Sequence, residues 1–432
     1  MAADDSEQAL ADPGEANDLP GGVGHVYPLG SRINAAGRLE IGGCDVVDLA
    51  REVGTPAYVY AEDDLRRRAR ATVAAFADRV DDFEVLYASK AFPCVAALRI
   101  LAEEGLSCDV ASGGELHLAL RGGFDPERIY MHGNNKTPEE LEYALASGVG
   151  HVIVDSFDEI DRLARVAGGR PQRVLLRVTP GLRPETHYKI ATGQEDSKFG
   201  IPLAQLPDAV ARCEAAGLEV RGLHAHIGSQ VFDLDIYDAL AEVLAAAGDF
   251  PVVNMGGGFA VAYTRDQHPP RAAEFAEKMV ERLPKGVKVL CEPGRSLVAN
   301  AGVTLYTVGT VKEIPGIRTY VAVDGGMSDN IRPMLYDAVY EAEIADRFGD
   351  STPCRLVGMH CESGDVLVKD AALAEPRPGD TLVMPATGAY GHAMASNYNA
   401  LRRPPVIFCR DGDARVVVRR ETYEDLTLRD VE

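Results

Sequence analysis

The segment FEVLYASKAFPCVAALRILAEEGLSCDV (83–110) decides the fold, because a strand, a helix and a second strand follow one another within it. FEVLYAS (83–89) and LSCDV (106–110) are apolar runs of the length and composition of buried strands. VAALRILAEEG (95–105), which lies between them, has the apolar spacing of an amphipathic helix. A strand, a helix and a second strand in this order predict two parallel neighbours in one sheet.

The same unit recurs along the chain. Six more apolar runs follow: RIYMHG (128–133), HVIVDS (151–156), RVLLRV (173–178), EVRGLHAHI (219–227), FPVVNMGG (250–257) and KVLCEPG (288–294). The predicted helices have suitable ends, with Thr137 and Ser156 at starts and Gly105, Gly148 and Gly168 at ends. About eight strand–helix units close a (β/α)₈ TIM-like barrel, and an open doubly wound sheet is the alternative.

After about residue 302 the pattern changes to strands that mostly lack intervening helices. These runs are VTLYTVGTVKE (303–313), RTYVAVDGG (318–326), CRLVGMHC (354–361), DTLVMPATG (380–388), PPVIFCR (404–410) and ARVVVRR (414–420). They predict a C-terminal antiparallel β domain. The expected organisation is a disordered acidic tail (1–22), a segment joining the β domain (23–47), the barrel (48–302) and the β domain (303–432).

Composition and charge exclude several classes of protein. The 432 residues are 46% hydrophobic and 25% charged, which is the balance of a globular protein. A formal net charge of −22 argues against a nucleic-acid partner. No apolar run approaches the roughly 18 residues that span a bilayer, and the acidic N-terminus has no signal-peptide pattern. The eight cysteines form no CxxC pair, which predicts reduced thiols and a cytoplasmic location.

Polar side chains follow the predicted strands at the points where the strands end. Because a (β/α)₈ barrel has its active site at the carboxyl ends of its strands, this set predicts one pocket. Its members are Lys90, Asp109, His132, Asp155, His226, Ser229, Gly256 to Gly258, Glu292 and Arg295.

Three members of this set each allow a functional and a structural interpretation. A desolvated Lys90 amine is a nucleophile able to form an imine, although a lysine at a strand end can also extend to solvent. The glycines 256–258 suit close approach to a phosphate, or a plain turn. Arg295 suits a phosphate contact, or a surface ion pair.

A metal site is the weakest interpretation of the histidines. His224 and His226 alternate on a strand and so face the same side, but no third ligand is evident. We therefore expect a site without a metal.

These motifs occur together in an order that closely resembles the diaminopimelate decarboxylase family, which belongs to the alanine-racemase-like group of pyridoxal-phosphate enzymes. The resemblance covers residues 26 to about 425. It rests on YASKA (87–91), HGNNK (132–136), HIGSQ (226–230), GGGF (256–259), EPGR (292–295), CESGD (361–365), GAY (388–390) and SNYN (396–399).

The resemblance implies a cofactor, pyridoxal 5′-phosphate, and a role for each matching residue. Lys90 matches the lysine that forms the Schiff base, and Glu292 matches the carboxylate that keeps the pyridine nitrogen protonated. His226 matches the residue that stacks on the ring, and Asp109 an acid near the imine. The remaining cofactor positions are Ser229, Gly256, Gly257, Gly258, Pro293, Gly294, Arg295 and Tyr390.

The resemblance also implies the reaction, which is decarboxylation of meso-2,6-diaminopimelate to L-lysine, the last step of lysine biosynthesis. Cys361 matches the proton donor. The positions that hold the substrate are Arg295, Arg332, Tyr336, Glu362 and Tyr390. An arginine together with a glutamate suits the distal carboxylate and ammonium of diaminopimelate, whereas ornithine would need only the acid.

The resemblance further implies a homodimer, in which the β domain of the neighbouring subunit brings Cys361 to each barrel. Two other functions stay open. One is a related decarboxylase of the same fold that acts on carboxynorspermidine, ornithine or another diamino acid. The other is a catalytically silent homologue, which would be expected to lack Lys90, Cys361 or Glu292, yet all three are present.

Overall fold

The computed structural model describes residues 23–182, 197–349 and 351–431, so the tail predicted over 1–22 lies outside the described residues. The chain divides into two compact units. The barrel unit consists of Ala69–Ala260 and Pro269–Ser296, and the β unit of Met1–Arg68, Val261–His268 and Leu297–Glu432.

Eight parallel strands form a closed ring in the barrel unit. They are β5 (Phe83–Ala88), β6 (Ser107–Val110), β7 (Ile129–Met131), β8 (His151–Val154), β9 (Arg173–Thr179), β11 (Glu219–His224), β12 (Val252–Asn254) and β13 (Lys288–Cys291). The pairs β13–β5 and β8–β9 close the ring, and the short β10 (Ile201–Pro202) adds to β9. The predicted barrel is therefore confirmed, and the open doubly wound sheet is wrong.

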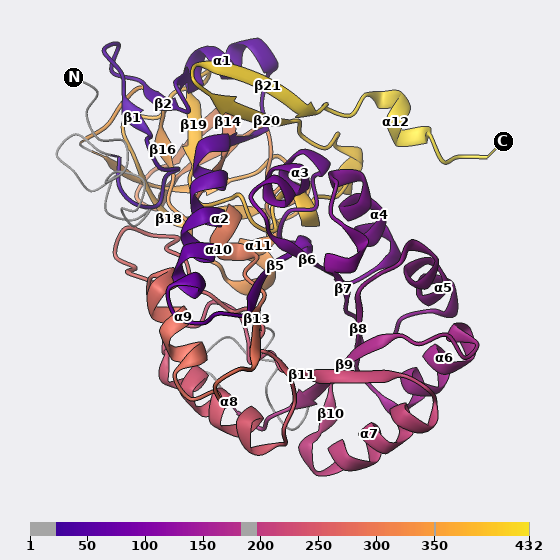
Figure 1. Cartoon of the computed structure of the whole chain (residues 1–432). Helices are drawn as coiled ribbons and strands as arrows, with labels where there is room; N and C mark the ends of the chain where they lie inside the picture. The colour runs from indigo at the N-terminus through magenta and orange to yellow at the C-terminus, as the bar shows by residue number, and fades with distance from the viewer. Residues whose placement is uncertain (1–22, 183–196, 350, 432) are drawn as a thin grey trace. The chain divides into compact units, whose positions relative to one another are not determined.

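Helices lie around the outside of this ring (Figure 1). They are α3 (Val95–Glu103), α4 (Gly113–Gly122), α5 (Pro138–Ser147), α6 (Phe157–Ala167), α7 (Leu206–Ala215), α8 (Asp235–Ala246) and α9 (Ala272–Val280). The predicted caps are present: Thr137 forms a capping box with Glu140, and Ser156 accepts from the backbone of Glu159. Gly148 and Gly168 end their helices in the left-handed conformation that glycine adopts without strain.

Buried apolar and aromatic side chains fill the interior of the barrel. One cluster of buried side chains takes a residue from each of six strands: Leu86, Tyr130, Ile153, Leu175, Val252 and Leu290. Gly222 lets β11 and β12 approach, because a Cβ there would lie 1.9 Å from the carbonyl oxygen of Val252. Gly222 therefore allows β11 and β12 to pair in parallel, with Gly222 opposite Val252.

The β unit contains a larger and a smaller sheet. The main path is β18 (Val366–Leu373), β17 (Thr352–Val357), β15 (Arg318–Val323), β14 (Gly302–Ile314), β4 (Ala57–Ala61), β20 (Val406–Arg410) and β21 (Asp413–Val418). Two strands lie off this path, β19 (Thr381–Met384) and β16 (Glu343–Ile344). The small sheet is formed by β1 (Arg32–Ile33), β2 (Leu39–Ile41) and β3 (Cys44–Asp45). Most pairs are antiparallel, as predicted, but β15–β17 and β4–β20 are parallel.

Helices of the β unit are short. They are α1 (Val46–Val53), α11 (Arg332–Tyr336) and α12 (Tyr423–Thr427). Two further helices, α2 (Glu62–Ala77) and α10 (Arg295–Val298), cross the division between the units.

The observed division differs from the expected barrel range of 48–302. β4 falls within that range, yet it pairs antiparallel with β14 and parallel with β20, so it is a strand of the β unit. All five residues of β4 are buried, which suits a strand with neighbours on both sides. The run predicted over 354–361 is a strand only as far as Val357, and β18 was not predicted.

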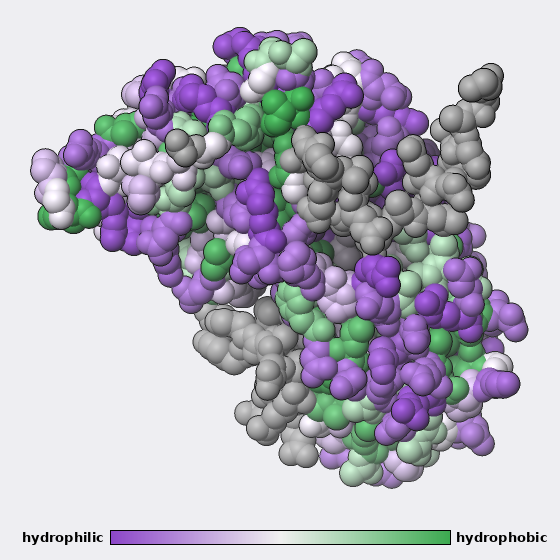
Figure 2. All heavy atoms as spheres, turned by 90° about the vertical axis from the view of Figure 1, so that its left-hand side faces the viewer, coloured by the Kyte–Doolittle hydropathy of each residue, from purple (hydrophilic) through white to green (hydrophobic). Residues whose placement is uncertain are grey.

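Among the described residues, no helix has the length and apolar character needed to cross a membrane. Hydrophilic side chains cover most of the surface seen in the space-filling view, and apolar side chains occur there in small groups (Figure 2).

Candidate active site

Eight buried polar side chains lie at or near the carboxyl ends of the barrel strands. They are Ser89 (directly after β5), Asp109 (β6), His132 (directly after β7), Asp155 (directly after β8), Arg177 (β9), His224 (β11), Asn254 (β12) and Glu292 (directly after β13). Buried polar groups need partners, so their mutual contacts determine what this face can bind.

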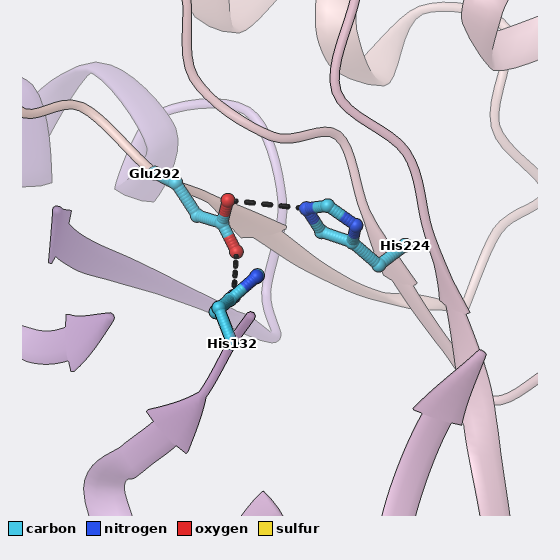
Figure 3. Close-up of side chains that lie close together, drawn as sticks. All are labelled: His132, His224 and Glu292. Atoms are coloured by element: carbon cyan, nitrogen blue, oxygen red, sulfur yellow. Dashed lines mark hydrogen bonds and ion pairs between the residues drawn. The ribbon is translucent and has the colours of Figure 1, made fainter. Parts of the chain in front are cut away.

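Glu292 lies at the centre of this group. Its Oε1 accepts a hydrogen bond from Asn254 Nδ2 at 2.7 Å and lies 2.8 Å from His132 Nε2. Its Oε2 lies 3.1 Å from His224 Nε2. Figure 3 shows the carboxylate between the two imidazole rings, which come from different strands. Both oxygens therefore have partners, and the carboxylate is held in one orientation.

This arrangement keeps Glu292 charged. Burial favours the protonated acid, but His132 and His224 outweigh burial and hold the pKa of the Glu292 carboxyl well below its usual range. Burial lowers the pKa of His224 to about 4, although Glu292 opposes this shift, so the ring is neutral near pH 7. The barrel face thus contains a fixed negative charge that can stabilise a protonated ring nitrogen.

Lys90 lies on the 3₁₀ turn Ser89–Ala91 directly after β5, and its side chain is exposed. The positive charge of Lys90 acts on two other predicted site residues. It adds to the lowering of the His226 pKa, and it partly opposes the rise of the Asp109 pKa that burial causes. The pKa of His226 lies well below its usual range, mainly because the ring is buried and secondly because of the Lys90 charge. Nδ1 of His226 accepts a hydrogen bond from the Gly257 amide at 3.2 Å, which fixes this neutral ring.

The glycines 256–258, called the glycine cradle here, form a loop in which a side chain would collide with neighbouring backbone. Gly256 and Gly258 have φ angles of +67° and +105°, which only glycine adopts readily. A Cβ on Gly257 would lie 2.2 Å from the carbonyl oxygen of Glu292. A Cβ on Gly294 would lie 3.0 Å from the Ala88 side chain. The backbone of these loops can therefore approach a ligand closely.

Arg295 supplies a cation beside this cradle. Its side chain is buried, and its guanidinium donates to Ser229 Oγ at 2.8 Å. A buried guanidinium and a hydroxyl are groups that bind a phosphate.

Among the described residues, one group has the geometry to hold a metal ion, and it consists of His132, His224 and Glu292. Their ligand atoms lie within 4.8 Å of one another. His226, the partner in the histidine pair considered from the sequence, bonds Gly257 instead. Since Asn254 also donates to Glu292, the carboxylate serves as a hydrogen-bond acceptor, and a site without metal stays our prediction.

Four of the five predicted substrate residues lie in the β unit, and the fifth, Arg295, lies in the barrel unit. Arg332, on α11, is buried and bonds the Tyr340 hydroxyl, and its guanidinium carbon lies 4.7 Å from the centre of the Tyr263 ring. Burial opposes the charge of Arg332, but the tyrosines Tyr263, Tyr340 and Tyr390 outweigh it and raise its pKa. Tyr336 ends the same helix and is partly buried. This group holds a permanent cation among aromatic rings.

Cys361 and Glu362 lie on the loop 358–365 between β17 and β18, and both are exposed. The backbone amide of Cys361 donates to Asn399 Oδ1 at 2.8 Å. Cys361 is the exposed member of the eight cysteines, and the other seven are buried.

The structure thus places the predicted cofactor residues other than Tyr390 in the barrel unit, and the predicted substrate residues other than Arg295 in the β unit. Sequence reasoning missed Arg177, Asn254, Tyr263 and Tyr340, and considered His224 only as a metal ligand. Arg177 gave a usable signal, because it is a charge within the apolar run 173–178. Asn254 directly precedes Met255 and the three glycines, at a strand end.

The pKa of Asp109 predicts a pH-dependent stability. Burial, with a contribution from Glu292, raises this pKa to about 6, although His132 and Lys90 oppose the rise. In the unfolded chain an aspartate titrates near 3.9. Between about pH 4 and pH 6 Asp109 therefore binds more protons in the native state than in the unfolded chain, so its own contribution to stability falls as the pH rises, by about 3 kcal/mol in total.

Asp109→Asn removes this titration. We expect the stability of this variant relative to wild type to increase from pH 4 to pH 7, as measured by urea unfolding of the ligand-free protein. A difference between the two proteins that is the same at every pH would contradict the assignment.

Comparisons with known proteins agree with this geometry. The family model described as "Pyridoxal-dependent decarboxylase, pyridoxal binding domain" matches residues 62–299. Diaminopimelate decarboxylase of Bacillus subtilis is 46% identical over 93% of this chain and 97% of its own. That of Actinosynnema pretiosum is 48% identical over 94% of this chain and 95% of its own.

Solved structures give the same result. A crystal structure of diaminopimelate decarboxylase from M. jannaschii, in complex with L-lysine, has a TM-score of 0.87 at 32% identity. The match covers 93% of this chain and 98% of that one. A Helicobacter pylori diaminopimelate decarboxylase, also complexed with L-lysine, has a TM-score of 0.83 at 31% identity and covers 89% and 98%. The chain therefore belongs to the diaminopimelate decarboxylase family of pyridoxal-dependent decarboxylases.

Proposed function

We propose that this protein decarboxylates meso-2,6-diaminopimelate to L-lysine and CO₂ with pyridoxal 5′-phosphate as cofactor, as the final step of lysine biosynthesis. The observation that carries the proposal is the charged Glu292 carboxylate, buried on the same barrel face as the glycine cradle and Lys90. The names of the full-length relatives support the same activity.

The residues on this face fit the cofactor. The glycines 256–258 and Gly294 are packed too closely against the protein for a side chain, and Ser229 and Arg295 supply donors for a phosphate. Glu292 suits a protonated pyridine nitrogen, and the amine of Lys90 suits the aldehyde. The chemistry that bound pyridoxal phosphate would supply is an electron sink for decarboxylation of the substrate.

The chain's own groups then have defined tasks. Glu292, which His132 and His224 keep ionised, would stabilise a positive ring nitrogen of the cofactor. His226 offers the face of a neutral ring, held by Gly257. Asp109, with a pKa of about 6, can take or give a proton close to Lys90 near neutral pH.

Substrate choice follows from the distal end of diaminopimelate, which carries a carboxylate and an ammonium. Arg332, kept charged among its tyrosines, suits the carboxylate, and Glu362 suits the ammonium. Ornithine and related diamines lack the distal carboxylate, so they would leave Arg332 without its counter-ion. A lysine/ornithine decarboxylase of Vibrio vulnificus has a TM-score of 0.74 at 24% identity, which reflects the shared fold alone.

Cys361 is the proposed proton donor to the carbon that loses CO₂. It is exposed, and several apolar side chains of the β unit are exposed as well. They are Met334 (46%), Val339 (64%), Met359 (53%) and Tyr398 (42%). Exposed apolar side chains of this kind support a homodimer whose sites each use both chains. Eight free cysteines support a reducing, cytoplasmic compartment.

The activity is tested by adding pyridoxal phosphate to the purified protein and incubating it separately with meso-diaminopimelate, lysine, ornithine and arginine. The CO₂ and the amine product are then measured. We expect CO₂ and L-lysine from diaminopimelate, and little CO₂ from the other three. Comparable turnover of ornithine would favour the alternative decarboxylase, and no CO₂ from any substrate would favour a silent homologue.

Arg332→Ala tests whether Arg332 binds the distal carboxylate of the substrate. We expect kcat/KM for meso-diaminopimelate to fall by about 2–4 kcal/mol in transition-state binding, because the substrate carboxylate loses its partner. Arg355→Ala is the matched control, since Arg355 donates to the Lys369 carbonyl on the β unit and should leave kcat/KM unchanged. An Arg332→Ala enzyme with wild-type kcat/KM would contradict this role.

Complementation tests the shared site. Lys90→Ala and Cys361→Ala should each be nearly inactive, but mixed dimers should restore up to about a quarter of wild-type activity. This fraction follows because random exchange makes half of the dimers mixed, and one of their two sites is then intact. If the mixture stays inactive after subunit exchange is demonstrated by mass spectrometry, Cys361 acts within its own chain.

A further inference from the structure

The loop that carries Cys361 is folded back on itself. The amide of Glu362 donates to the carbonyl of His360 at 2.8 Å, so Cys361 occupies the middle of a three-residue turn. The amide of Gly358 donates to the carbonyl of Asp365 at 3.1 Å, which closes the base of the loop. The position of the thiol therefore depends on what holds the residues on each side of it.

His360, on one side of Cys361, is fixed by Asp365. Oδ2 of Asp365 lies 2.7 Å from His360 Nδ1 and accepts from the His360 amide at 3.0 Å, and both side chains are buried. Oδ1 accepts from the amide of Met327 at 2.7 Å. A Cβ on Gly326 or Gly358 would overlap the same carboxylate, at 2.5 and 2.1 Å. Asp365 therefore occupies space that two glycines leave free.

Asn399 holds Cys361 directly. Its Oδ1 accepts the Cys361 amide at 2.8 Å, and the neighbouring Tyr398 ring stacks on His360 with 5.9 Å between centroids. Asn399 has a φ of 55°, a conformation that asparagine, aspartate and glycine tolerate better than other residues. The segment SNYN (396–399) was part of the sequence resemblance, but no role was assigned to it.

We propose that Asn399 is a positioning residue for Cys361, and that its amide oxygen, with the His360–Asp365 pair, holds the thiol so that the proton reaches one face of the substrate carbon. The proposal rests on the proposed function. A general acid must lie within hydrogen-bond reach of the atom it protonates, and a displacement of about 1 Å can lower the rate by about 100-fold. A loop fixed on both sides of the thiol provides that accuracy.

Two substitutions separate the hydrogen bond from the backbone conformation. Asn399→Gly keeps the positive φ but removes the acceptor, whereas Asn399→Asp keeps both. We expect Asn399→Gly to lower kcat about tenfold with KM within about threefold, since one hydrogen bond is lost at a residue that does not bind substrate. Asn399→Asp should retain at least about a third of wild-type kcat.

Two readouts would not respond to a merely structural role. Amide hydrogen exchange at Cys361 should become about tenfold faster in Asn399→Gly and stay near wild type in Asn399→Asp. In heavy water the wild-type enzyme should place deuterium on one face of the carbon that loses CO₂, and Asn399→Gly should give both isomers.

Asp411→Gly is the matched control, because Asp411 is exposed and has a φ of 52° on the turn between β20 and β21. It should change none of these measurements. Wild-type kcat and a single labelled isomer in Asn399→Gly would overturn the proposal, as would an Asn399→Asp enzyme as slow as Asn399→Gly. A wild-type enzyme that releases no CO₂ from diaminopimelate would contradict the proposed function instead, and the exchange rates would still decide whether Asn399 holds the Cys361 amide.

Discussion

The Glu292 carboxylate, contacted on both oxygens by His132, His224 and Asn254, keeps a negative charge inside the barrel mouth. A buried carboxylate without such partners would take up a proton, and the face could no longer stabilise a cationic ring nitrogen. The contacts require β11, β12 and β13 to be neighbours in register, as their parallel pairing makes them. The glycines 256–258 are needed for the same reason, because a side chain on Gly257 would collide with the backbone of Glu292.

The barrel could be predicted from the sequence because each strand is a short apolar run followed by a capped helix. β4 shows the limit of this reasoning. AYVYA (57–61) is also an apolar run followed by a helix, so its local pattern is that of a barrel strand. Its pairing with β14 and β20, more than 240 residues away, places it in the β unit, and no local signal contains that information. The parallel pair β15–β17 depends in the same way on contacts between distant segments.

The site was predictable to the extent that parallel strands bring their carboxyl ends together. Asp109, His226 and Glu292 could therefore be placed on one face from spacing alone. The partners that determine the charge of these residues could not be predicted, because the contacts depend on side-chain geometry. In the sequence, Asn254 was indistinguishable from a turn residue. Of the tyrosines around Arg332, Tyr263 lies 69 residues before it, and Tyr340 and Tyr390 lie 8 and 58 residues after it, so only the folded β unit brings them together.

We propose that the face around Glu292 holds the cofactor and that the amine which bonds the cofactor aldehyde is that of Lys90. Lys136, by contrast, is buried and already donates to Glu159 and to the carbonyls of Gly133 and Ile153. The most direct test is to reduce the protein with borohydride in the presence of pyridoxal phosphate and to map the modified peptide by mass spectrometry. A pyridoxyl group on Lys90 is the predicted result, and a pyridoxyl group on Lys136 or any other lysine instead would contradict the account.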